Sequence, residues 1–162
     1  MLKQLLEKKG NAFDDPLSQI EILTLEKEME IKINVPEFKF PQEFKELLSF
    51  AHRISINTFY NFKIPGYPEQ IDLITELGSN ELHYYFNFKD FEFDNYENEP
   101  IFHDFSNVFC VAGCHASGLI FMGHKGEYLN QIYYLVPYEW DSYPEFIKLA
   151  DSLTEFIDSL YE

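Results

Sequence analysis

The chain has 162 residues, 46% hydrophobic and 18% aromatic, which is enough to bury a core and to fold as one domain without disulfide bridges. Its 28 acidic residues outnumber the 12 basic ones and give a formal net charge of -16, which disfavours nucleic-acid binding and favours a basic partner. No apolar run approaches the roughly 18 residues of a membrane span, and Met1–Lys9 lacks the apolar centre of a signal peptide, so we expect a cytoplasmic protein with no membrane contact.

The first 16 residues contain a helical segment and then a break. Met1–Lys9 predicts a short, frayed helix, and the glycine, aspartates and proline of Gly10–Pro16 are typical of a loop. Residues 1–15 are therefore expected to form a loosely packed extension of a single domain that spans residues 1–162.

A second helix is predicted over Leu17–Met29. Ser18 is followed three residues later by Glu21, the spacing of a capping box, and no glycine or proline interrupts the segment. Its apolar spacing is less regular, so a start at Thr24 is the alternative. The alternation of Ile31–Val35 predicts a short strand after it.

An amphipathic helix is predicted over Phe40–Ala51. Pro41 stands where a first helical residue tolerates a missing N–H group. The apolar residues recur with the spacing of one helix face, and they are Phe44, Leu47, Leu48 and Ala51.

Strand signals increase after this helix. Ile54–Ile64 alternates over part of its length and predicts a strand or hairpin, which the turn Pro65–Pro68 closes. Ile71–Leu77 fits either a short helix or a strand. Leu82–Phe88 is rich in aromatic residues and predicts another strand.

The segment Phe86–Pro100, here called the acidic aromatic segment, interleaves aromatic rings with carboxylates. It is either a half-buried strand that runs into an acidic loop, or a surface on which rings supply contact area and carboxylates meet basic groups of a partner. The acidity of the whole chain has the same two interpretations, since it would also keep an aromatic-rich protein soluble. Under the second interpretation the partner-binding residues are Asp90, Glu92, Asp94, Tyr96, Glu97 and Glu99.

The centre of the sheet is predicted from Phe109 to Trp140. Three apolar runs, Phe109–Ala112, Leu119–Met122 and Ile132–Val136, are bounded by glycine, asparagine or proline, as consecutive antiparallel strands are. Two glycine-bracketed loops join them, Gly113–Gly118 and Gly123–Gly126. The first of these loops is the alternative position for a partner-binding surface.

A last helix is predicted to begin at Ser152. Glu155 would complete a capping box with it, and the apolar spacing of one helix face follows in Leu153, Phe156, Ile157 and Leu160. The preceding Phe146–Ala150 either extends this helix backwards or forms a separate turn that Ser152 ends, and we favour the separate turn.

Residues that could carry chemistry do not form a recognisable pattern. Cys110, Cys114 and His115 are zinc-binding residue types, but a structural zinc site usually repeats a pair of cysteines two to four residues apart. Gly113–Gly118 lacks the order of a serine nucleophile turn, and no glycine-rich phosphate loop occurs. We therefore predict no disulfide, no metal, no cofactor and no enzymatic activity.

The order of several segments resembles the SUKH superfamily, which groups fungal cell-wall-assembly regulators with bacterial immunity proteins. Phe40–Leu48 is similar to the start of its first helix, and Phe109–Ala112 with Gly118–Gly123 to its two central strands. Gln131–Tyr134 is similar to its third strand, and Ala150–Ile157 to its terminal helix.

This resemblance implies an α+β fold with a single mixed or largely antiparallel sheet flanked by helices. It further implies a non-enzymatic protein that binds and neutralises a cognate toxin, often a nuclease, inside the cell that makes the toxin. No catalytic residues carry over. The alternative function is a scaffold or regulatory protein-binding module of the same fold, and the third is an uncharacterised enzyme.

Overall fold

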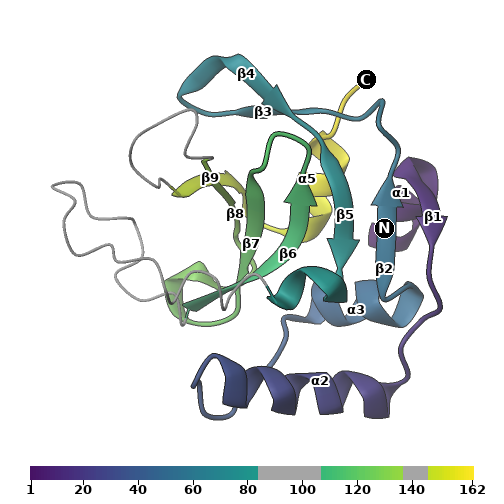
Figure 1. The fold of residues 1–162 in the computed structure, drawn as a ribbon, viewed down its shortest axis with the longest axis vertical. Coiled ribbons are helices and arrows are strands. Elements are labelled where there is room, and N and C mark those ends of the chain that lie inside the picture. Colours follow the sequence, from purple (N-terminus) through teal and green to yellow (C-terminus); the bar gives the residue numbers. More distant parts are fainter. Residues whose placement is uncertain (84–106, 137–145) are drawn as a thin grey trace, which may run out of the picture.

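The computed structural model describes residues 1–83, 107–136 and 146–162. These residues form an antiparallel sheet of seven strands in the order β1-β2-β5-β6-β7-β8-β9, with helices packed against it (Figure 1). Every pair of neighbouring strands is antiparallel. The predicted α+β class, with a largely antiparallel sheet flanked by helices, is confirmed.

Along the chain, a first helix is followed by one strand, then by two helices, then by the remaining strands and a last helix. The strands of the large sheet are β1 Gly10–Phe13, β2 Arg53–Ile56, β5 Ile74–Gly78, β6 Val108–Cys114, β7 Leu119–Gly123, β8 Ile132–Leu135 and β9 Phe146–Ala150. A separate hairpin consists of β3 Phe62–Ile64 and β4 Tyr67–Asp72. The helices are α1 Leu2–Lys9, α2 Gln19–Lys32, α3 Gln42–Phe50 and α5 Leu153–Ser159, with short 3-10 turns η1 Ser79–His83 and η3 Gly126–Tyr128.

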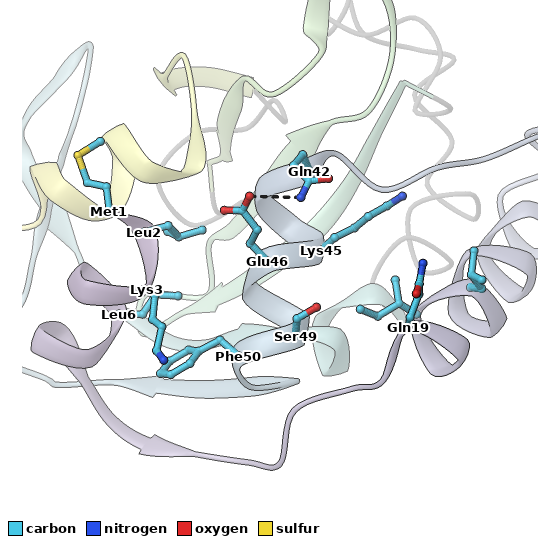
Figure 2. Close-up of a pocket in the computed structure, with 12 residues that line it drawn as sticks. Met1, Leu2, Lys3, Leu6, Gln19, Gln42, Lys45, Glu46, Ser49 and Phe50 are labelled. Carbon is cyan, nitrogen blue, oxygen red and sulfur yellow. Dashed lines mark hydrogen bonds between the residues drawn. The ribbon is translucent and has the colours of Figure 1, made fainter.

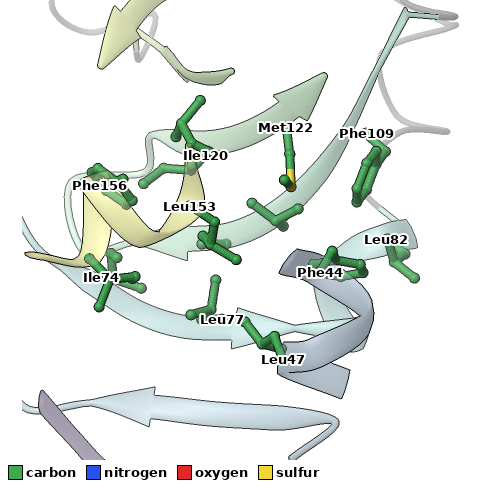
Figure 3. Packing of buried hydrophobic residues seen from close by; sticks show 14 of the residues in the cluster. Phe44, Leu47, Ile74, Leu77, Leu82, Phe109, Ile120, Met122, Leu153 and Phe156 are labelled. Carbon is green, nitrogen blue, oxygen red and sulfur yellow. The ribbon is translucent and has the colours of Figure 1, made fainter. Parts of the chain in front are cut away.

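The three predicted central strands are β6, β7 and β8, and β6 is the middle strand of the sheet. One face of these strands joins the core beneath the helices, where Phe109, Ile120 and Met122 lie (Figure 3). Phe121 and Tyr133 belong to a second buried cluster on the opposite face. Because both faces are buried, these strands are continuous apolar runs without polar alternation.

Helix α3 forms as predicted and is anchored to the central strand. Phe44, Leu47 and Leu48 have 0% exposure, and Pro41 is the residue that precedes the first helical turn. The ring of Phe44 lies 5.0 Å from the ring of Phe109 on β6, in an edge-to-face arrangement. An aromatic pair of this geometry contributes about 0.5 to 1.5 kcal/mol beyond the area that it buries.

Helix α2 has the predicted capping box but ends later than expected. The Ser18 side chain accepts from the Glu21 N–H, and the Glu21 carboxylate accepts from the Ser18 N–H. The strand predicted at Ile31–Val35 is wrong, since the helix continues to Lys32. Asn34 then adopts a left-handed φ of 54°, and Val35 N–H donates to the Glu30 carbonyl. The alternating segment Ile31–Val35 therefore forms the end of a helix, which a residue in the left-handed conformation terminates.

The N-terminal segment is packed rather than loose. Leu2 and Leu6 of α1 are buried, and Lys9 donates through Nζ to the carbonyls of Asp158 and Leu160 at the end of α5. The break predicted at Gly10–Pro16 is wrong for its first four residues, which form edge strand β1 against β2. Pairing with a distant strand decides this, so local residue preferences did not reveal it.

The segment after α3 divides into strands of two sheets. The predicted strand or hairpin Ile54–Ile64 contributes β2 to the large sheet and β3 to the hairpin, and the turn at Pro65–Pro68 joins β3 to β4. The ambiguous Ile71–Leu77 is strand rather than helix. Of the strand predicted at Leu82–Phe88, the first two residues belong to η1, and the rest lies outside the described residues.

The C-terminal segment contains a strand that the sequence did not predict. Phe146–Ala150 pairs with β8 as β9, so neither the extended helix nor the separate turn is correct. Ser152 caps α5 as expected, by accepting from the Glu155 N–H. The Glu155 carboxylate accepts from Asp151 N–H instead of the Ser152 N–H that a capping box requires.

Candidate functional site

The partner-binding residues predicted from the sequence all lie in residues 84–106, outside the described part of the chain. The stretches 84–106 and 137–145 contain nine acidic residues and one lysine, a net -8, which is half of the chain's -16. The acidic aromatic segment therefore stays a prediction based on sequence. The partner-binding residues predicted in this segment are Asp90, Glu92, Asp94, Tyr96, Glu97 and Glu99.

The second predicted position for a binding surface, the loop of residues 113–118, is described and joins β6 to β7. Cys114 N–H donates to the Gly118 carbonyl at 3.1 Å, which closes the loop. Ser117 has a φ of 66°, a left-handed conformation that is rare for residues other than glycine. His115 and Ser117 are exposed at its tip.

Asp72, at the end of β4, holds this loop in place. Its Oδ1 accepts from the Ala116 N–H at 3.0 Å and from the Leu73 N–H at 2.8 Å. Its Oδ2 accepts from the Tyr134 hydroxyl at 2.7 Å. Asp72 is 3% exposed, so three hydrogen bonds compensate the burial of its carboxylate.

The ring of Tyr134 packs against the loop at Gly118. Burial raises the pKa of its hydroxyl well above the ordinary range, and the hydrogen bond to Asp72 raises the pKa further. A Cβ at Gly118 would overlap the Tyr134 ring, so glycine is required there for the loop to approach β8. The loop is therefore fixed by a buried hydrogen-bond network and by close packing.

An acidic hollow of about 450 Å³ opens beside this loop. Glu76 on β5 and Glu81 on η1 supply its carboxylates, and the Thr75 hydroxyl donates to the Gly113 carbonyl at 3.1 Å. The carboxylate Oε1 of Glu76 lies 3.7 Å from the guanidinium Nε of Arg53. The lining residues are Thr75, Glu76, Glu81, Gly113, Cys114, Ser117, Gly118 and Leu119.

Cys114 also lines the hollow, but its surroundings disfavour the thiolate. Burial raises the pKa of the Cys114 thiol well above its ordinary value, and the negative charge of Asp72 adds to this effect. Burial does the same for the pKa of Cys110. Because the thiolate is the nucleophile and the metal ligand, both cysteines are poorly suited to either role. Among the described residues no three His, Cys, Asp or Glu side chains are grouped as metal ligands would be.

Neither Asp72 nor Tyr134 was predicted from the sequence as a residue that builds this site. The only local signal for Asp72 is that it interrupts the apolar run from Ile71 to Ile74. Tyr134 lies within a predicted strand, where nothing distinguishes it from a core residue.

In the described part of the chain, no helix is long and apolar enough to cross a membrane.

Comparisons of the chain with protein-family models, curated proteins and solved structures gave no match.

Proposed function

We propose that this chain is a non-enzymatic intracellular immunity protein of the SUKH type, which binds and neutralises a cognate protein toxin such as a nuclease. The observation that carries the proposal is the acidic hollow beside the fixed loop 113–118, in a chain with a net charge of -16. The resemblance of the core segments supports it, because it comes from several segments in the same order along the chain.

The loop and the hollow are suited to take a basic side chain from another protein. Since the loop is already held by Asp72 and Tyr134, little conformational entropy is lost when a partner contacts it. An arginine or lysine in the hollow would lie near the carboxylates of Glu76 and Glu81. A nuclease uses basic residues to hold its phosphate substrate, so an acidic protein that covers those residues blocks access to them.

The excess charge of the chain would also act before contact. Complementary long-range fields raise the rate at which two proteins meet, and this effect falls with ionic strength. The acidic aromatic segment fits the same role, with its carboxylates steering the partner and Tyr96 supplying contact area. In this proposal the segment steers the toxin, and the hollow takes one of its basic side chains.

Co-expression with toxin domains, beginning with any that a gene neighbouring this one encodes, tests this function. Growth should be restored by the wild-type chain and reduced again by Glu76→Lys, which reverses one charge in the hollow. Glu162→Lys makes the same charge change at an exposed terminal residue and should protect fully. Failure of the wild-type chain to protect against any such toxin would contradict immunity and leave the regulatory module as the better function.

A further inference from the structure

Arg53, the first residue of β2, lies between two carboxylates that it contacts unequally. Its Nε is 2.7 Å from Oδ2 of Asp14, and its Nη2 donates to Oδ1 of Asp14 at 3.2 Å, so the guanidinium and this carboxylate form a two-point pair. The same Nε is 3.7 Å from Oε1 of Glu76, which lines the acidic hollow. Arg53 is therefore bonded to Asp14, and its contact with Glu76 is longer and weaker.

The sheet places these three side chains together. Asp14 directly follows β1, and its N–H donates to the Arg53 carbonyl at 3.0 Å. On β2, Arg53 and Ser55 share the less buried face, and Ser55 is paired with Glu76 on β5. Glu76 is therefore a diagonal cross-strand neighbour of Arg53 on that face. The hydrogen bond to Asp14, and then the charges of Asp14 and Glu76, raise the pKa of the guanidinium.

A different arrangement is found at the groove of about 800 Å³ over α3, between α1 and α2 (Figure 2). There Lys45 lies 3.0 Å from the buried carboxylate of Glu26, and Gln42 donates to Glu46 at 3.2 Å. The carboxylates beside this groove thus already have close partners within the chain. At the acidic hollow, by contrast, the chain's own cation is held by a carboxylate that does not line the hollow.

We propose that Asp14 is a positioning residue of the binding site, which holds Arg53 away from Glu76 and so keeps the hollow acidic for the basic side chain of a partner. This inference rests on the proposed function, because it concerns the same hollow. The three side chains carry two negative charges and one positive charge. Without the charge of Asp14, the guanidinium would turn to Glu76 and neutralise the carboxylate that the partner needs.

A double-mutant cycle tests this coupling, with N-acetyl-arginine amide as the probe because it carries one guanidinium and no other charge. Asp14→Asn should weaken binding of the probe about two- to fivefold, and Arg53→Gln should strengthen it by a similar factor, since an exposed ion pair has effects of this size. The double variant should bind like Arg53→Gln, because Asp14 acts only through Arg53. A general effect of net charge would instead be additive, so the double variant would bind like the wild type.

Asp15→Asn is the matched control, since it removes the same charge from the neighbouring residue. The Asp15 side chain is exposed, and its carbonyl, which the substitution keeps, accepts from the His52 N–H. This variant should bind the probe like the wild type. His52 Nε2 also lies 3.4 Å from Oδ2 of Asp14, so the measurements are made at pH 8, where histidine side chains are ordinarily neutral.

Nuclear magnetic resonance of the free chain tests the position of Arg53 without any ligand. In Asp14→Asn, the nuclear Overhauser effect between the Arg53 Nε–H and the Glu76 side chain should become stronger, and the Glu76 carboxyl carbon should change its chemical shift. Asp15→Asn should change neither. Unchanged Arg53 and Glu76 signals in Asp14→Asn would overturn the inference, and so would a double variant that binds the probe like the wild type. If the cycle behaves as expected but no toxin domain binds, the role of Asp14 stands and the proposed function fails.

Discussion

The Tyr134 hydroxyl donates a 2.7 Å hydrogen bond to Oδ2 of Asp72, which lies 62 residues earlier in the chain. The bond joins β8, in the large sheet, to the end of β4, in the hairpin. Because Oδ1 of the same carboxylate accepts from the Ala116 N–H, the tyrosine and loop 113–118 are parts of one network. The shape of the candidate binding loop therefore depends on a contact in the core.

Tyr134→Phe is expected to lower the free energy of unfolding by about 1 to 3 kcal/mol, since it leaves the buried Asp72 carboxylate short of one donor. Urea denaturation followed by circular dichroism measures this. Tyr161→Phe, at a residue 36% exposed, is the control and should change stability by less than about 0.5 kcal/mol. Equal effects of the two substitutions would mean that the Asp72–Tyr134 bond contributes little.

The same tyrosine should make stability depend on pH in the alkaline range. Its pKa is raised in the folded state by burial and by Asp72, so above the unfolded pKa of about 10 the unfolded chain loses a proton that the folded chain keeps. The contribution is complete below pH 10 and decreases as the pH rises above it, by up to about 1.4 kcal/mol per unit. The stability difference between wild type and Tyr134→Phe, measured from pH 8 to 11, should therefore shrink above pH 10.

The elements that could be predicted from sequence are those whose signals are local. The strands around Phe109, Ile120 and Ile132 are apolar runs between turn residues, and the caps at Ser18 and Ser152 lie next to the helices that they begin. Each of these features depends on residues that are close to one another in the sequence. Contacts between distant segments are therefore not needed to predict it.

The incorrect predictions concern segments whose structure is decided by a partner far away in the sequence. Phe146–Ala150 fits a helix or a strand by composition, and its pairing with β8 selects the strand. Gly10–Phe13 becomes a strand because β2 is beside it. Asp72 could not be recognised as the residue that organises the loop, because its partners Ala116 and Tyr134 are far away in sequence.

Glu26→Gln should destabilise the fold by about 1 to 3 kcal/mol, because it removes the charge that Lys39 and Lys45 contact. Burial alone would raise the pKa of Glu26, but hydrogen bonds from Lys45, Lys39 and the Phe40 N–H outweigh it and lower the pKa. The stabilisation is thus present above the unfolded pKa of about 4.3 and is lost as the pH falls through the lower folded value. Acid unfolding curves of wild type and variant should converge at low pH.

Leu48→Asp and Phe156→Asp should each prevent folding at 37 °C, because both side chains are buried and the substitution introduces a charge without a partner. Circular dichroism at increasing temperature tests this prediction. Ile71→Asp makes the same kind of change at a residue 53% exposed and should melt near the wild type. A cooperative melt of either buried variant near the wild-type temperature would contradict the assigned core.

Neutralising the acidic aromatic segment should slow association with the toxin and flatten its dependence on salt, while the fold stays intact. The variant replaces by Asn or Gln the residues Asp90, Glu92, Asp94, Glu97 and Glu99. A control with the same change in net charge replaces exposed carboxylates elsewhere, at Glu7, Glu28, Glu69, Asp158 and Glu162. If both variants slow association equally, net charge rather than this segment steers the partner.

Tyr96→Ala should act mainly on dissociation if its ring is a contact.

The most direct measurement is stopped-flow association of the purified chain with a toxin domain that a neighbouring gene encodes, at two ionic strengths. We predict a complex of one chain with one toxin, inhibition of the toxin's activity at that stoichiometry, and an association rate that falls as salt is added. A toxin that remains fully active in excess of the chain, with no association at either ionic strength, would contradict the proposal that this protein neutralises it.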